Sequence, residues 1–140
     1  MNIMMKYLTI SLSIAILVIV KELNTCGHMK TFAASIDADG IQRVELLAGA
    51  YSFNPDHIVV KVNIPIELKV RKEPGIVPHN FIIKEPEAGL DIKESLSTEQ
   101  KVIKITPKKT GTYPFYCDKK FLFFESHRKK GMEGFIEVTE

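Results

Sequence analysis

Apolar and polar residues alternate along several short segments of this 140-residue chain. The clearest alternation covers residues 65–72, where Ile66, Leu68 and Val70 fall on one face and charged residues fall on the other. This period of two is typical of a β-strand with one buried face. We predict further strands at similar segments, which are residues 44–50, 57–62, 79–84, 101–106, 112–117 and 133–139.

Turn-forming residues separate these segments. Residues 51–56 (YSFNPD), 73–75 (EPG) and 107–111 (PKKTG) contain residue types that favour turns. Residues 86–100 have no sustained period and contain Gly89, so we interpret them as a long connection. Short strands joined by such turns predict one all-β domain with the architecture of a β-sandwich.

The beginning of the chain is typical of an export segment. Lys6 supplies a positive charge, and residues 7–20 contain no charged residue. This apolar stretch is short for a membrane span and has the length of a signal-peptide core. We assign residues 1–34 to a signal peptide or to an N-terminal membrane or lipid anchor, and residues 35–140 to the folded domain. Either interpretation places the domain on the periplasmic or extracellular side of a membrane.

Charge and motif content exclude several classes of function. The formal net charge is only +2, and no stripe of Lys and Arg interleaved with aromatic residues occurs. We therefore expect no binding to nucleic acid. The sequence also lacks a Ser/His/Asp triad, a phosphate-binding loop and paired carboxylates. We therefore expect no enzyme of the classes that depend on these motifs.

Cys117 is the only thiol of the predicted domain, because the other cysteine, Cys26, lies in the predicted export segment. A single cysteine cannot form a disulfide within the domain. A buried core residue, an intermolecular bridge, a nucleophile and a metal ligand remain possible roles for it. A disulfide between Cys26 and Cys117 is open only if Cys26 stays in the mature chain.

Residues 111–132 concentrate the candidate chemistry. This stretch contains Cys117, His127 and Met132, and His79 lies upstream of it. Two His, one Cys and one Met are the ligand set of a mononuclear blue-copper centre. Each of these residues alone has an ordinary structural role, as a core or surface residue. Gly131 allows a tight backbone turn immediately before Met132.

Three motifs that contain these residues resemble motifs of the cupredoxin family. The motifs are residues 78–80 (PHN), residues 111–117 (GTYPFYC) and residues 127–132 (HRKKGM). The resemblance covers roughly residues 42–140. It implies a Greek-key β-sandwich that binds one copper ion (Cu+/Cu2+) at one end through His79, Cys117, His127 and Met132. It also implies that Asn80 braces the ligand loop or forms a hydrogen bond near the thiolate.

One segment departs from the cupredoxin pattern. Nine residues, 118–126, separate Cys117 from His127, whereas plastocyanin-like proteins have two to four. This insertion leaves room for a short helical turn, and it also makes Glu125 a possible alternative ligand. A carboxylate-bearing red-copper site, similar to that of nitrosocyanin, would then be formed. Other candidate carboxylates for such a site are Glu73, Glu85 and Glu87.

The resemblance implies a one-electron carrier that is not an enzyme. Two alternatives remain open. One is a red-copper site with small-molecule reactivity, and the other is a periplasmic copper chaperone. Zinc fits the ligand set less well, because a thioether is a poor ligand for zinc.

The insertion also suggests a docking surface for redox partner proteins. In the cupredoxin pattern the second His ligand lies near an apolar surface where partners dock. The apolar residues 121–124 (FLFF) are flanked by Lys119, Lys120, Arg128, Lys129 and Lys130. Such a surface would suit an acidic partner, although we expect at least two of the three Phe side chains to cover the core instead. Membrane attachment is expected only through the N-terminus.

Overall fold

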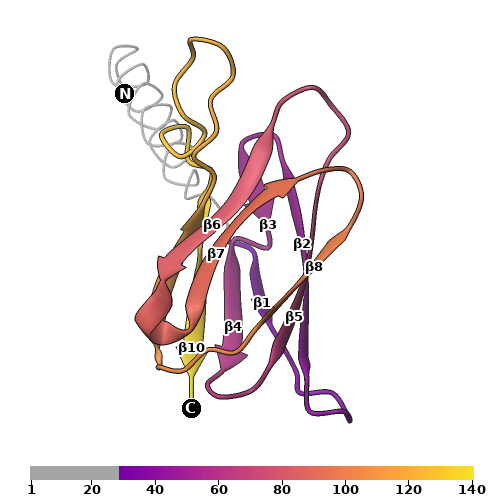
Figure 1. Ribbon diagram of the computed structural model, residues 1–140, viewed down its shortest axis with the longest axis vertical. Helices are drawn as coiled ribbons and strands as arrows, with labels where there is room; N and C mark the ends of the chain where they lie inside the picture. Colours follow the sequence, from indigo (N-terminus) through magenta and orange to yellow (C-terminus); the bar gives the residue numbers. More distant parts are fainter. Residues whose placement is uncertain (1–28) are drawn as a thin grey trace, which may run out of the picture.

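The computed structural model describes residues 29–140, which form two stacked β-sheets (Figure 1). The first sheet has the strand order β1-β4-β10-β9-β6-β7, and the second has the order β3-β2-β5-β8. β4 pairs in parallel with both β1 and β10, and β2 pairs in parallel with β5. The predicted all-β fold, a Greek-key β-sandwich, is therefore confirmed.

The strands of the first sheet are β1 (Thr31–Ala33), β4 (His57–Lys61), β10 (Glu133–Thr139), β9 (Gly111–Tyr116), β6 (His79–Glu85) and β7 (Leu90–Leu96). Those of the second sheet are β3 (Ser52–Asn54), β2 (Gln42–Gly49), β5 (Ile66–Lys72) and β8 (Lys101–Ile105). The one helical element of the described part is a 3-10 turn, η1 (Pro86–Ala88).

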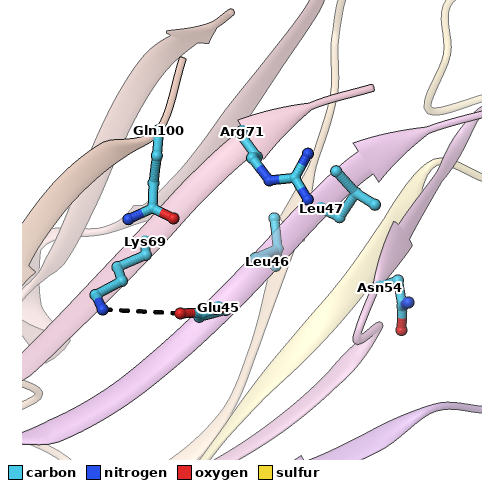
Figure 2. A pocket seen from close by; sticks show the side chains of 7 residues that line it. All are labelled: Glu45, Leu46, Leu47, Asn54, Lys69, Arg71 and Gln100. Atoms are coloured by element: carbon cyan, nitrogen blue, oxygen red, sulfur yellow. Dashed lines mark ion pairs between the residues drawn. The ribbon is translucent and has the colours of Figure 1, made fainter. Parts of the chain in front are cut away.

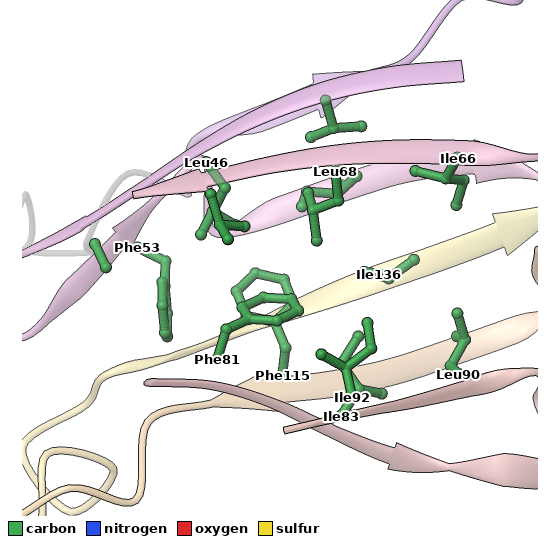
Figure 3. Packing of buried hydrophobic residues seen from close by; sticks show 14 of the residues in the cluster. Leu46, Phe53, Ile66, Leu68, Phe81, Ile83, Leu90, Ile92, Phe115 and Ile136 are labelled. Carbon is green, nitrogen blue, oxygen red and sulfur yellow. The ribbon is translucent and has the colours of Figure 1, made fainter. Parts of the chain in front are cut away.

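The two sheets enclose an apolar core built from alternate residues of the strands. The predicted inward face of β5 is buried as expected. Near the start of β6, the rings of Phe53, Phe81 and Phe115 pack against one another, with centroids 5.1 to 6.0 Å apart (Figure 3). Aromatic pairs at such separations add to the stability that burial alone provides. These three residues join both sheets beneath one end of the sandwich.

Three strands were not predicted from the sequence. The interpretation of residues 86–100 as a connection is wrong, because this segment contains η1 and the edge strand β7. β7 pairs with β6 along its length and buries Leu90, Ile92 and Leu96. Its alternation is weak because Gly89 precedes it and a charged residue, Glu94, occupies an inward position of the strand. β3 lies within the predicted turn, and β1 lies within the predicted export segment.

Most of the predicted export segment lies outside the described residues, and its prediction is untested. Within residues 29–140, no helix has the length and apolarity that crossing a membrane requires. β1 pairs with β4 from Thr31 to Ala33. The folded part of the chain therefore begins before residue 35.

The turn between β2 and β3 has an unfavourable backbone conformation. Ala50 has φ 48° and Tyr51 has φ 60°. A two-residue hairpin loop of this kind is normally formed by Asn-Gly or Gly-Gly, because both of its residues need positive φ. A residue with a side chain pays about 1–2 kcal/mol for a left-handed conformation. The rest of the structure must compensate for this cost.

We expect Ala50→Gly to raise the free energy of unfolding by about 0.5–1 kcal/mol, because glycine adopts positive φ without a steric penalty. Urea unfolding of the metal-free protein measures this difference. Ala48→Gly is the matched control, because Ala48 is buried within β2, and it should lower stability. Equal losses in both variants would show that the turn is not strained.

Candidate metal centre

Three metal-ligating side chains converge at one end of the sandwich. The Cys117 Sγ atom lies 3.5 Å from His127 Nδ1 and 4.0 Å from His79 Nδ1. His79 is the first residue of β6, Cys117 directly follows β9, and His127 lies in the connection from β9 to β10. In Figure 1 this connection extends beyond the end of the sheets at which β6 begins. All three side chains are buried.

The separations between these donor atoms fit a single metal ion. All three donor atoms lie within 4.8 Å of one another. A metal bound at about 2.0–2.3 Å to a sulfur and to imidazole nitrogens holds these donors roughly 3.5–4 Å apart. A thiolate with two imidazoles suits both oxidation states of copper. The cofactor of this centre is copper, with one ion per chain.

Met132 is held between two of these residues. Its side chain is fully buried. The Cys117 backbone N–H donates to the Met132 carbonyl (3.1 Å), and the Met132 N–H donates to the His127 carbonyl (2.9 Å). Gly131 has φ 91°, a conformation that favours glycine, and it turns the chain into Met132 as expected. The backbone thus keeps Met132 adjacent to the three donors.

Asn80 braces the centre from beneath. Its backbone N–H points at the Cys117 Sγ atom (3.4 Å). Its side chain donates to the Asp118 carboxylate (2.7 Å) and accepts from the Asp118 backbone N–H (3.1 Å). The two roles expected for Asn80 are therefore both present in the structure. Such contacts orient metal ligands and limit their movement.

Burial controls the protonation of the metal-free centre. It lowers the pKa of His79 to about 4, with smaller contributions from the nearby His127 and Lys72. Burial and the charge of Lys130 also lower the pKa of His127. Burial raises the pKa of the Cys117 thiol, although hydrogen bonds from backbone N–H groups oppose this. At neutral pH the imidazoles are therefore neutral and ready to bind, whereas the thiol must lose a proton.

A backbone hydrogen bond explains how the long connection preserves the position of His127. The His127 N–H donates to the Lys119 carbonyl (2.8 Å), which closes the base of the loop. The residues between them protrude, with a turn from Phe121 to Phe124 (Phe124 N–H to Phe121 carbonyl, 3.2 Å). The helical turn considered for residues 118–126 is absent from the structure. The chain turns back on itself instead, with Leu122 at φ 55°, a left-handed conformation that a right-handed helical turn does not allow.

The tip of this loop exposes apolar side chains. The exposed fractions are 72% for Leu122, 89% for Phe123 and 49% for Phe124, and Phe121 is half-buried. The expectation that at least two of the three Phe side chains cover the core is wrong. The turn directs two of them into solvent. We call Leu122, Phe123 and Phe124 the apolar tip.

The structure brings no carboxylate of the described residues into the donor cluster. Glu125 is exposed and does not belong to the donor cluster. Within residues 29–140, no Asp or Glu joins His79, Cys117 and His127 in one group. The protruding loop carries Glu125 away from the centre, because it lies on the exposed side of the loop closure.

Tyr51 is a residue of the site that sequence reasoning missed. Its ring packs edge-on against the ring of His127, with centroids 4.9 Å apart, and lies 6.5 Å from that of His79. The Lys130 Nζ atom lies 4.2 Å from the centroid of the Tyr51 ring. The sequence does not show which residues Tyr51 contacts, because His127 and Lys130 are distant from it along the chain.

The larger surface hollows lie away from the donor cluster. One of about 190 Å³ occupies the outer face of the second sheet, next to the Glu45–Lys69 ion pair (Figure 2). A smaller hollow of about 110 Å³ reaches His79 between the β2–β3 turn and residues 72–77. The hollow that reaches His79 is smaller than a typical ligand pocket.

Comparisons with known proteins agree with this geometry. The metal-binding domain of the Cu(I)-exporting P-type ATPase CopA of Streptococcus pneumoniae D39, solved with Cu(I), is similar at 27% identity. The match covers 81% of this chain and 100% of that one, with a TM-score of 0.61. Reduced auracyanin of Roseiflexus castenholzii matches at 17% identity, covering 76% and 99%, with a TM-score of 0.57.

Rusticyanin of Thiobacillus ferrooxidans matches at 18% identity, covering 79% of this chain and 82% of that one, with a TM-score of 0.57. No curated protein sequence matches the chain significantly. The family model described as a cupredoxin-like domain matches residues 13–132, which is most of the chain. Together with the fold and the buried His, Cys and His cluster, this match shows that the chain belongs to the cupredoxin family.

Proposed function

We propose that this protein is an exported one-electron carrier whose copper is bound by His79, Cys117, His127 and Met132. The observation that carries the proposal is the convergence of three buried donor atoms beside a buried Met132. Export is supported by the uncharged residues 7–20. The scarcity of space at the cluster favours a carrier over an enzyme, because a substrate would need a pocket there.

The bound copper would supply a one-electron change between its cuprous and cupric states. The chain contributes rigidity, because His79 and Cys117 belong to or directly follow strands of one sheet. Asn80 restrains the sulfur by its backbone N–H and restrains the chain after Cys117 by its side chain. Ligands that move little between the two oxidation states make electron transfer fast. Burial also keeps water away from the donors.

Copper delivery is a second candidate function. It is favoured by the 27% identity to the metal-binding domain of a Cu(I)-exporting ATPase. A delivery protein must release its ion readily to a partner. In this chain His79 is 6% exposed and the other three residues are fully buried. This burial favours retention of the ion and therefore the carrier.

We expect the full chain loaded with cupric ion to show an intense thiolate-to-copper absorption band and narrow copper hyperfine splitting in EPR. Cys117→Ser should abolish the band, because it removes the thiolate. Met132→Leu should keep the band and change the reduction potential, since it conserves volume and removes only the thioether. A colourless wild-type protein, or a Cys117→Ser variant with an unchanged spectrum, would refute the copper-thiolate centre.

Metal binding should release about one proton per ion at neutral pH, because the buried Cys117 thiol is protonated before it binds. The imidazoles should release none, since their pKa values are lowered. Calorimetric titration in buffers with different ionisation enthalpies measures this number. The measurement is made on the Cys26→Ser variant. The double variant, which also carries Cys117→Ser, should release no proton when metal is added. Equal proton release by both chains would contradict the assignment.

We also propose that an acidic redox partner docks at the apolar tip and the Lys and Arg side chains around it. Of these, Lys120, Arg128, Lys129 and Lys130 are exposed. Opposite charges speed the encounter of two proteins, and apolar contact then fixes their orientation. An exposed apolar patch of this kind is typical of an interaction site.

Lys120→Glu with Lys129→Glu should slow electron exchange with hexacyanoferrate(III), an anionic probe, by about tenfold at low salt. The difference should shrink as ionic strength rises. The matched control is Lys108→Glu with Lys109→Glu, because these exposed residues precede the opposite end of β9. If both double variants react at the same rate, the charges around the tip do not guide docking.

A further inference from the structure

The metal centre does not reach the surface through His127. This side chain is fully buried, and its Nε2 atom has no hydrogen-bond partner among the described residues. A buried imidazole nitrogen without a partner costs free energy unless something else offsets the loss. The Tyr51 ring packs edge-on against the His127 ring, with centroids 4.9 Å apart.

Tyr51 is held in place from outside by a cation. The Lys130 Nζ atom lies 4.2 Å from the centroid of its ring and 5.4 Å from that of Phe124. A cation over an aromatic face contributes about 0.5–1 kcal/mol at an exposed position. Tyr51 is half-buried, so one side of the ring contacts the ligands and the other side faces the surface. The order from the surface inward is Lys130, Tyr51 and His127.

The backbone that carries Tyr51 is strained. Positive φ at an aromatic residue is rare, and such conformations concentrate at functional sites. The contacts of the Tyr51 ring with His127 and Lys130 help to offset this strain. The free-energy difference between this conformation and one in which the turn relaxes and the ring swings outward is therefore smaller than in an unstrained hairpin.

The same turn borders a way into the centre. Gly49 and Ala50 form one wall of the hollow of about 110 Å³ that reaches His79. Residues 72–77 form the opposite wall. His79 is also the most exposed of the four proposed ligands, at 6%. Outward movement of residues 49–51 would widen this hollow and uncover both imidazoles at once.

We propose that the β2–β3 turn is a gate over the metal centre, with Tyr51 as its closing group and Lys130 as its latch. In the closed state the gate retains the ion and excludes small ligands. In the open state a copper ion enters or leaves past the two imidazoles. The exchange of copper rests on the proposed function, whereas the closure of the centre by Tyr51 does not.

The chain offers a matched control for the Tyr51–Lys130 pair. Tyr116 is also half-buried, directly precedes Cys117 in the chain and has the Arg128 guanidinium 3.9 Å from its ring centroid. Its neighbour Cys117 faces the core, so alternation along the strand directs Tyr116 to the opposite face. Removing this ring tests general loosening near Cys117 without opening the gate.

The first experiment measures alkylation of the Cys117 thiol by iodoacetamide in the metal-free full chain with Cys26→Ser. We expect Tyr51→Ala to speed labelling at least tenfold and Lys130→Gln to speed it severalfold. Tyr51→Phe should label like the parent chain, because the ring and not the hydroxyl makes the contact. Tyr116→Ala and Arg128→Gln should also label like the parent.

Equal labelling of Tyr51→Ala and Tyr116→Ala would overturn the proposal. The urea midpoint of each variant shows whether it is folded. If Tyr51→Ala is unfolded, Lys130→Gln against Arg128→Gln decides the question, because each removes an exposed cation over a ring; Arg128→Gln also removes the ion pair with Glu133, which makes it the more disruptive control. Unchanged labelling of Lys130→Gln would then overturn the gate.

The second experiment follows copper uptake by the growth of the thiolate-to-copper band, and copper loss to a cuprous chelator. Tyr51→Ala should accelerate both and leave the final spectrum unchanged. Unchanged rates would refute the gate for copper. If the wild-type chain never develops the band while labelling of Cys117 follows the expected order, the proposed function fails and the gate stands.

Discussion

The hydrogen bonds between Asn80 and Asp118 tie the start of β6 to the chain that follows β9. The relative position of two of the metal ligands depends on this tie. It brings the Cys117 sulfur to His79, although the two residues are far apart in the sequence. The Asn80 backbone N–H directed at the sulfur also favours the thiolate that metal binding requires. His127 and Met132 then complete the cluster. Its other two residues, His79 and Cys117, lie in or directly after strands of one sheet.

The inserted loop changes the surface and preserves the ligands. Because the Lys119 carbonyl accepts from the His127 backbone N–H, the residues between them do not alter the position of the imidazole. These residues form instead a protruding loop that carries the apolar tip. The centre itself is covered by a residue from the opposite sheet, Tyr51. The protruding loop and the cover of the centre thus come from different segments of the chain, and Lys130 contacts both of them through Phe124 and Tyr51.

Sequence patterns predicted the strands whose alternation is strong, such as β5, because burial on one face imposes a period of two. They missed β7, where Gly89 and the charged Glu94 at an inward position obscured the alternation, and they misjudged the loop tip. A Phe next to a turn faces either the core or solvent. The local pattern of apolar and polar residues is the same in both cases, so it does not distinguish them. The role of Tyr51 was also hidden, because it depends on positive φ and on a contact with His127, a residue distant in sequence.

The aromatic cluster at the base of the centre has a consequence for the copper itself. Phe81 and Phe115 each lie two positions from a residue of the centre, namely His79 and Cys117. Side chains two positions apart along an extended strand share a face. The packing of Phe81 and Phe115 against each other and against Phe53 therefore helps to set the spacing of these two ligands. A change of shape in this apolar layer would be transmitted upward to the copper coordination, so the reduction potential can be tuned by residues that never contact the metal.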